Sequence, residues 1–343
     1  MSVHPNVRVD VCPGPRAFVD LEEEWNDLLR RSTMNTIFLT WEWQGIWWDC
    51  FGEDAQLTIL TVREKGELIG LAPLYARRSN DGQRTLRLVG GVEVSDYLDI
   101  IASTGKEQVV YTALWHFLVD EHRYPWDVLD LHNVPATSPT LTVMRDLVGD
   151  TPGFEISAVV EDVCPVLDLP STWGEYLSLL NKKQRHEVRR KIRKANREAE
   201  VTWYYALNET SLEAEVDDFI QLHQKSDKQK MAFMDQRMQP FFHAIARAAL
   251  EQGWLKLAFL VVNSAKVASV FCFDYDDAIL VYNSGYDPAL HSSLSTGIVL
   301  LAYCIEDAIE NGRKAFDFLR GEEEYKCRFG GARTEIHNVR ISR

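Results

Sequence analysis

The stretch Leu255-Lys-Leu-Ala-Phe-Leu-Val-Val-Asn-Ser-Ala-Lys-Val-Ala-Ser-Val-Phe-Cys-Phe-Asp274 decides the fold of the second half of this chain. Two apolar runs, 255–262 and 266–274, flank the turn residues Asn263-Ser264-Ala265. Such runs around a short polar turn predict a β-hairpin. The residues that follow predict a third strand over 278–284, a helix over 294–310 that ends at Asn311-Gly312, and a fourth strand over 315–319.

The same order of elements occurs in the first half of the chain. The pattern there predicts a hairpin over 57–63 and 68–77, strands over 86–89 and 97–102, a helix that starts at a Thr104–Glu107 capping box, and a strand over 127–131. We interpret this recurrence as an internal duplication. A chain of 343 residues also exceeds what one core usually supports. We therefore predict an α/β (α+β) fold with two domains, 1–160 and 161–343, each a mixed, mostly antiparallel sheet flanked by helices.

Composition narrows the classes of function. The formal charge of −14 argues against general binding to nucleic acids or membranes. The six cysteines form no C-x-x-C pair and the nine histidines no H-x-x-x-H motif, so we predict no metal site. No apolar run approaches the length of a membrane span, and the first residues lack the pattern of a signal peptide. We expect a cytoplasmic protein without stable membrane insertion.

The segment Phe316-Asp-Phe-Leu-Arg-Gly-Glu-Glu-Glu-Tyr-Lys-Cys-Arg-Phe-Gly330 resembles the C-terminal signature of the CelD-like branch of the GNAT acyltransferases. The resemblance covers most of the chain and is strongest over 170–330. It implies tandem GNAT-like domains, an activated acyl donor and a link to cellulose or exopolysaccharide production. FemAB-like aminoacyl transferases share the duplicated plan. Further segments that fit the branch are Tyr286-Asp287-Pro288, Ser295-x-Gly297-x-x-Leu300, Asp96-Tyr97 and the arginines at 185, 189 and 193.

The resemblance places the donor at the start of the helix after Tyr286-Asp287-Pro288. The backbone amides at a helix N-terminus suit phosphate groups, so Ser295, Thr296 and Gly297 are candidates to bind an acyl-CoA-type donor. The usual GNAT pattern, Arg/Gln-x-x-Gly-x-Gly/Ala, is altered here, because Ser292 and Ser295 stand at its first two key positions. The alternative is that these hydroxyl groups only cap a buried helix.

The signature segment supplies the candidate catalytic residues. A tyrosine hydroxyl is protonated at neutral pH, so Tyr325 is a candidate general acid for the departing thiolate. Among the three neighbouring glutamates Glu323 is a candidate base, and Asp317 is placed at the cleft by its alternation with the flanking phenylalanines. Arg320 and Lys326 are candidates for binding the donor's anionic groups. Each of these charges also suits a solvated ion-pair surface.

Other residues are candidates to bind the acceptor or a larger partner. Asp96 and Tyr97 are predicted to line an acceptor site. The segment 182–197 carries nine Lys or Arg residues, among them Arg185 and Arg189, together with an apolar stripe, and predicts an amphipathic helix. Its basic face suits a phosphorylated lipid or tRNA, although pairing with acidic neighbours is an equally physical use.

Three hypotheses of function follow. The first is acyl transfer from a thioester to an amine or hydroxyl of a small, cell-envelope or exopolysaccharide precursor. The second is FemAB-like aminoacyl transfer from charged tRNA. The third, favoured by the altered start of the helix near residue 295, is a GNAT-like scaffold without catalysis in polysaccharide synthesis.

Overall fold

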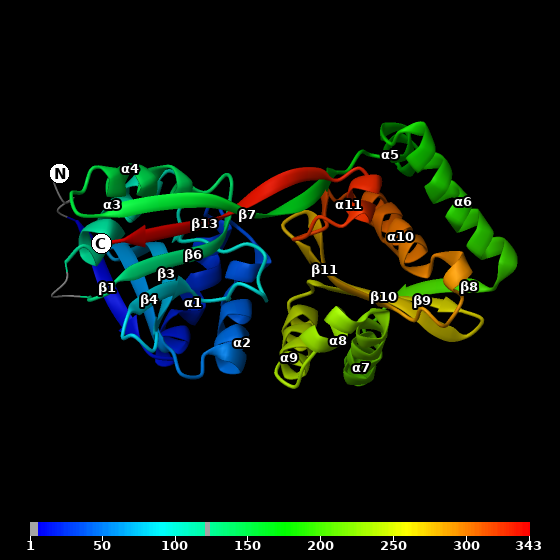
Figure 1. Ribbon diagram of the computed structural model, residues 1–343, viewed down its shortest axis with the longest axis horizontal. Helices are drawn as coiled ribbons and strands as arrows, with labels where there is room; N and C mark the ends of the chain where they lie inside the picture. The colour runs from blue at the N-terminus through cyan, green and yellow to red at the C-terminus, as the bar shows by residue number, and fades with distance from the viewer. Residues whose placement is uncertain (1–5, 121–123) are drawn as a thin grey trace. The chain divides into compact units, whose positions relative to one another are not determined.

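The computed structural model describes residues 6–120 and 124–343. The chain divides into two compact units, which are treated separately (Figure 1). Unit 1 comprises the described residues up to Val163 together with Thr334–Arg343, and unit 2 comprises Cys164–Arg333. The last ten residues thus lie in unit 1, whereas the sequence analysis assigned them to the second domain. The reason is that Ile336–Ser342 pair with Val128–Pro135 of unit 1.

Unit 2 follows the predicted order of hairpin, strand, helix and strand. Its strands are β8 (Val201–Tyr205), β9 (Leu255–Val262), β10 (Ala265–Tyr275), β11 (Ala278–Tyr286), β12 (Ala315–Asp317) and the end of β7 (Glu155–Asp168). Its helices are α5 (Trp173–Leu179), α6 (Lys182–Glu198), α7 (Glu209–Ser226), α8 (Lys228–Phe233), α9 (Met238–Glu251), α10 (Thr296–Glu310) and α11 (Glu324–Arg328), with a 3-10 turn η3 at Ser292–Leu294.

The sheet of unit 2 opens at one edge of β11. Strands β8, β9, β10 and β11 are antiparallel neighbours, whereas β12 lies parallel to β11. The parallel pairing covers only Ala278–Leu280 opposite Ala315–Asp317, although β11 continues to Tyr286. A β-bulge also shifts the register of β10 and β11 between Phe271 and Cys272. Strands β11 and β12 therefore diverge beyond residue 280 and leave room beside the second half of β11.

Helices cover both faces of this sheet. Figure 1 shows α6 and α10 on one face and α7, α8 and α9 on the other. The core under α10 is built from small and branched side chains such as Val270, Val281 and Val299, whereas rings of Phe219, Phe242 and Phe271 pack together on the α7 face. The buried side chains on each face pack closely, which fixes the spacing between the strands and the helices.

Between Thr172 and Ala199 the chain forms two helices. Helix α5 ends at Leu179, Leu180 adopts an extended conformation, and α6 starts at Lys182. The side chains of Asn181 and Gln184 form a capping box at the new start. A helix can restart there because this pair satisfies backbone donors that would otherwise face solvent.

Unit 1 repeats the architecture with its own elements. Strands β2, β3 and β4 are antiparallel, and β6 lies parallel to β4. Figure 1 shows α1 and α2 on one side of these strands and α3 and α4 on the other. The elements are β1 (Val7–Pro13), α1 (Arg16–Arg30), η1 (Ile37–Leu39), α2 (Trp41–Phe51), β2 (Gln56–Glu64), β3 (Glu67–Arg78), β4 (Arg84–Leu88), β5 (Ile101–Ala102), α3 (Glu107–Leu118), β6 (Val128–Pro135), η2 (Pro139–Leu141), α4 (Val143–Gly149), most of β7, and β13 (Ala332–Ser342).

The predicted fold class is confirmed, since both units are mixed, mostly antiparallel sheets flanked by helices. Two local predictions in unit 1 are wrong. The strand predicted over 97–102 is reduced to β5, and the Thr104 capping box does not form. Thr104 instead donates through Oγ1 to the carbonyl of Arg31, and α3 starts at Glu107.

One strand in each unit lies far in sequence from the strand with which it pairs. In unit 1, β13 pairs antiparallel with β6. In unit 2, the end of β7 pairs antiparallel with β12. The sequence of unit 1 is therefore discontinuous, because the sequence of unit 2 is inserted between its two segments.

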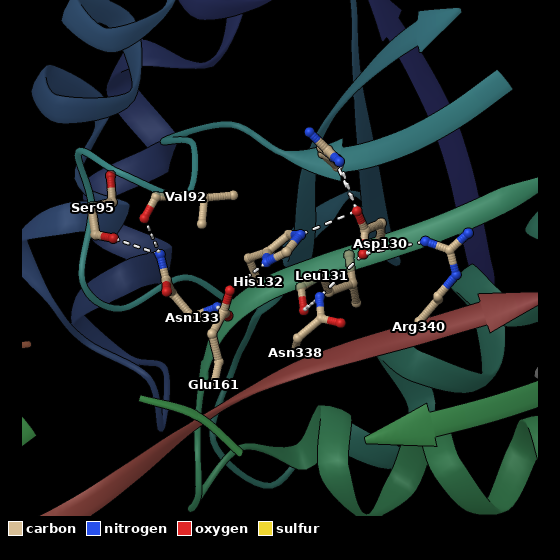
Figure 2. A network of polar contacts seen from close by, with 10 residues as sticks. Val92, Ser95, Asp130, Leu131, His132, Asn133, Glu161, Asn338 and Arg340 are labelled. Atoms are coloured by element: carbon tan, nitrogen blue, oxygen red, sulfur yellow. Dashed lines mark hydrogen bonds and ion pairs between the residues drawn. The ribbon is translucent and has the colours of Figure 1, made fainter. Parts of the chain in front are cut away.

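A buried polar network ties β13 to the rest of unit 1 (Figure 2). His132 bridges two carboxylates, with Nδ1 2.6 Å from Glu161 and Nε2 3.1 Å from Asp130. Asp130 also accepts hydrogen bonds from Arg87 at 2.9 Å and from Asn338 of β13 at 3.1 Å. Burial by itself would lower the pKa of His132, but the bonds to Asp130 and Glu161 outweigh it and raise that pKa.

The network also positions the loop that carries Asp96 and Tyr97. Asn133 donates its backbone N–H to Glu161 at 3.0 Å. Its side chain donates to the carbonyls of Val92 and Ser95, at 3.0 and 2.6 Å (Figure 2). These bonds hold the backbone just before Asp96.

The stability of unit 1 is expected to depend on pH through His132. Because its folded pKa lies above the ordinary value of 6.5, its contribution is full below pH 6.5 and is lost as the pH rises through the raised value. Thermal unfolding of wild type and of His132→Gln across this range measures the effect. We expect the difference between them to shrink as the pH rises, and parallel curves would contradict the assignment.

Candidate active site

Unit 2 contains a cavity of about 750 Å³ beside the diverging part of β11. Its walls come from β10, β11, the start of α10, helix α8 and the segment that leads into α11. The residues that line it are Asp227, Gln229, Lys230, Ser269, Val270, Val281, Tyr282, Asn283, Ser284, Gly285, Tyr286, Pro288, Ser292, Ser295, Thr296, Gly297, Ile298, Leu301, Phe318, Arg320, Glu323, Tyr325 and Lys326.

The start of α10 faces this cavity. Ser295, the residue before the helix, has a φ of 54°, a left-handed conformation in which glycine is the usual residue. Within the described residues no side chain caps this helix. A Cβ atom added at Gly297 would meet nothing within 4 Å. The first amides of α10, together with the positive end of the helix dipole, therefore form a surface that an anionic group can approach closely.

Tyr325 lies in α11 on the cavity wall. Its ring packs edge-on against Phe318, and among residues 6–120 and 124–343 its hydroxyl has no hydrogen-bond partner. Burial, with smaller effects of Glu323 and Cys272, raises the pKa of Tyr325 well above the ordinary value of 10. The phenol therefore remains protonated at neutral pH and can donate a proton to a strongly basic group.

An ion pair with the buried Lys326 places Glu323 at the cavity. Lys326 is only 3% exposed and donates to the carbonyls of Leu319 and Arg320, at 3.1 and 2.6 Å. Its Nζ lies 3.0 Å from Oε2 of Glu323. Gly321, with a φ of 120°, allows this approach, because a Cβ there would lie 2.4 Å from the same carboxylate oxygen. The Glu323 carboxylate is thus held by a fixed ammonium while its side chain stays 56% exposed.

Helix α8 supplies a wall that the sequence analysis missed. Asp227 caps α8 by accepting from the backbone of Gln229 and Lys230, so the helix starts at a fixed point. The Lys230 ammonium donates to Ser284 on β11, at 2.6 Å to the carbonyl and 3.3 Å to the hydroxyl. Burial lowers the pKa of Lys230. The signals that could have predicted this wall are the Asp227 cap and the helical spacing of Leu212, Val216 and Phe219.

The structure brings together seven of the predicted catalytic and donor-binding residues. Ser295, Thr296 and Gly297 line the cavity from α10, and Arg320, Glu323, Tyr325 and Lys326 line it from the signature segment. Phe318 also lines it, whereas Asp317, its neighbour, does not. Asp317 is buried and accepts from the backbone N–H of Leu319 at 2.7 Å. The predicted alternation of Asp317 with the flanking phenylalanines fails, because β12 ends at Asp317 and Leu319 has a φ of 54°.

The predicted acceptor residues are not among the residues that line this cavity. Asp96 is buried in unit 1, and the Tyr97 ring lies edge-on to Phe38 of the same unit. Arg185 and Arg189 lie on α6, where Arg185 donates to the carbonyl of Leu177 at 3.4 Å and Arg189 is exposed. Their assignment to substrate remains a prediction.

The basic helix α6 is partly neutralised by its own carboxylates. Glu187 pairs with Arg190 and Lys191, and Glu198 pairs with Lys194 and Arg197. Lys194 also donates to the carbonyl of Ser293 at 2.8 Å. This contact anchors α6 beside the turn that leads into α10.

No group of three or more His, Cys, Asp or Glu side chains in the described part of the chain could hold a metal ion. None of the described helices has the length and apolar character needed to span a bilayer.

Comparisons with known proteins agree with the geometry of unit 2. A family model described as "Acetyltransferase (GNAT) domain" matches residues 182–327, a range that contains α8, α10 and the signature segment up to Cys327. A search of curated proteins found no match.

Solved structures share the fold of the whole chain at low sequence identity. FemX superposes with a TM-score of 0.66 and 10% identity, over 92% of this chain and 95% of FemX. A conserved protein of unknown function from Bacteroides thetaiotaomicron superposes with a TM-score of 0.58 and 12% identity, over 97% of this chain and 100% of that protein. L-PGS from Bacillus licheniformis superposes with a TM-score of 0.56 and 11% identity, over 92% of this chain and 90% of L-PGS. The chain thus has a fold similar to that of FemX, and its residues 182–327 match the model of a GNAT-type acetyltransferase domain.

Proposed function

We propose that this chain transfers an acyl group from an acyl-CoA-type thioester to an amine or hydroxyl of a small, cell-envelope or exopolysaccharide precursor, as a CelD-like GNAT enzyme. One observation carries the proposal: the uncapped start of α10 and the protonated Tyr325 line the same cavity. The first is an anion-binding surface, and the second is a proton donor that the reaction requires.

The residues have distinct roles in this reaction. The amides of Thr296 and Gly297 hold the donor's pyrophosphate. The acceptor nitrogen attacks the thioester carbonyl carbon and loses its proton to the Glu323 carboxylate. The carbon–sulfur bond then breaks, and Tyr325 gives its hydroxyl proton to the thiolate that leaves. Lys326 keeps Glu323 in place. Solvent then accepts the proton from Glu323 and restores the proton of Tyr325.

Binding and turnover test the proposal together. We expect acetyl-CoA to bind the wild-type protein in calorimetry and to release free thiol in the presence of a broad panel of amines. Gly297→Ala introduces a methyl group where the phosphate would approach, and should weaken binding about tenfold or more, since a hydrogen bond to a charged group is worth roughly 1.5–3 kcal/mol. Absence of both binding and thiol release in the wild type refutes the thioester reaction.

Gly149→Ala in unit 1 is the matched control. A Cβ at Gly149 also meets nothing within 4 Å, and neither glycine has a positive φ. Both variants should melt no lower than wild type, because alanine suits a helix better than glycine by about 0.5–1 kcal/mol. Only Gly297→Ala should affect the donor. Equal losses in both variants would show that the effect is not local.

A second candidate is aminoacyl transfer from charged tRNA, in the manner of FemAB-like enzymes. The observation that favours it is the contact of α6 with Ser293, which sets a basic helix beside the start of α10. Filter binding of tRNA should then weaken steeply as salt increases, and less steeply for Arg189→Gln. If no tRNA is retained at low salt, this candidate is excluded.

A further inference from the structure

The cavity has a second polar region on the α7 face of the sheet, opposite to α10. Ser269 lies opposite Gly285 in the register, and Asn283 lies opposite Phe271, whose ring packs against Phe219 of α7. Residues two apart on a strand share a face, so Ser269 and Asn283 belong to the α7 face. Val270, by contrast, belongs to the core under α10. The cavity therefore extends around the diverging edge of β11 to both faces.

This region presents hydrogen-bond donors. Ser269 is 1% exposed, lines the cavity, and its hydroxyl has no hydrogen-bond partner among the described residues. The amide oxygen of Asn283 lies 3.0 Å from Nε2 of His223. Burial, with the nearby charge of Lys230, lowers the pKa of His223 to about 4, so the neutral ring donates to that oxygen. The NH2 group of Asn283 is then the part left for a ligand.

The Lys230 ammonium adds a positive charge to this region of the cavity. Its ammonium donates to the carbonyl and hydroxyl of Ser284, and within the described part of the chain no carboxylate lies within ion-pair distance of it. Two carboxylates line the cavity nearby, but Asp227 is engaged as the cap of α8 and Glu323 is paired with Lys326. Burial outweighs the favourable charges of Asp227 and Glu323 and lowers the pKa of Lys230, so an anionic ligand in direct contact would stabilise the ammonium.

We propose that Lys230, Ser269 and Asn283 form a subsite that binds a carboxylate of the acyl acceptor, so that the acceptor is an amine that also carries a carboxyl group. The inference rests on the proposed function for the identity of the ligand as acceptor. One ammonium and two neutral donors match the single charge and two oxygens of a carboxylate. The donor's phosphates are bound on the other face, at the start of α10.

Matched pairs of small amines test the subsite. Ligand-observed NMR titrations compare L-alanine with ethylamine and L-lysine with cadaverine, in the presence of coenzyme A. We expect each carboxylate-bearing member to bind about 10- to 100-fold more tightly than its partner, as removal of a hydrogen-bonded charge pair usually produces. Phosphoethanolamine and ethanolamine form a third pair. Tight binding of phosphoethanolamine without binding of the amino acids overturns the carboxylate assignment.

Three variants locate the effect. Lys230→Met should abolish the preference, whereas Lys228→Met, on the same helix but outside the cavity, should retain it. Ser269→Ala removes a buried hydroxyl that has no partner, so it should fold at least as well as wild type and still bind carboxylates several-fold more weakly. Equal binding of both members of every pair, or an unchanged preference in Lys230→Met, overturns the subsite.

The readouts separate the two proposals. If carboxylates bind and Lys230→Met loses the preference while no thiol is ever released, the subsite stands and the thioester reaction fails. If thiol is released with ethylamine as readily as with L-alanine, the reaction stands and the subsite fails.

Discussion

Tyr325→Phe is expected to lower kcat by about 10²- to 10⁴-fold, the usual loss when a general acid is removed. The reason is that Tyr325 lines the cavity and its hydroxyl is protonated at neutral pH. Because the hydroxyl has no partner among the described residues, its removal breaks no bond in the fold. The melting temperature should therefore remain that of wild type. Single-turnover measurement of thiol release separates this loss from a change in binding.

Tyr176→Phe is the control for this substitution. The Tyr176 hydroxyl is buried and donates to the carbonyl of Phe329 at 3.0 Å, outside the residues that line the cavity. The same change there should cost about 1–3 kcal/mol of stability and leave kcat unchanged. If Tyr325→Phe turns over like wild type, or fully complements a deletion strain, Tyr325 is not the acid and the scaffold hypothesis gains support.

Gly285→Ala is expected to have the largest effect on stability. A Cβ at this position would lie 2.3 Å from the backbone nitrogen of His223 and 2.5 Å from the carbonyl carbon of Leu222. Both are backbone atoms of α7, so the helix must move away from β11. Overpacking of this kind costs about 1–3 kcal/mol or more. In a unit of this size each kcal/mol lowers the melting temperature by roughly 2–4 °C.

The displacement should also reach the cavity. His223 holds Asn283, and Lys230 of α8 holds Ser284, so movement of these helices disturbs the wall that faces β11. Urea unfolding followed by binding assays on the folded fraction measures both effects. Gly297→Ala, where nothing lies within 4 Å, provides the comparison for a methyl group without a clash. An unchanged midpoint for Gly285→Ala would mean that α7 and β11 are not packed as described.

The sequence predicted most of what depends on local pattern. The hairpin of β9 and β10 and helix α10 follow from continuous apolar runs bounded by polar turns, and these elements formed where expected. The signature segment also predicted that Tyr325 and Lys326 lie near each other, and both line the cavity, because a motif keeps its residues together in sequence as well as in space.

Contributions from distant segments could not be predicted in the same way. Lys230 reaches the cavity only because α8 packs near the edge of β11. Ser269 lines the cavity only because β11 and β12 diverge after residue 280 and leave space beside β11. Asp317 was misplaced for a different reason. A strand of three residues that is followed by a left-handed residue does not maintain the alternation on which its placement depended.

The order in which the chain is synthesised gives the strand arrangement a further consequence. Cys164–Arg333 is synthesised before Thr334–Arg343, so β6 lacks its neighbour β13 for most of the synthesis of the chain. An unpaired strand edge is a site for association with other chains. Unit 1 is therefore exposed to co-translational aggregation until β13 pairs with β6.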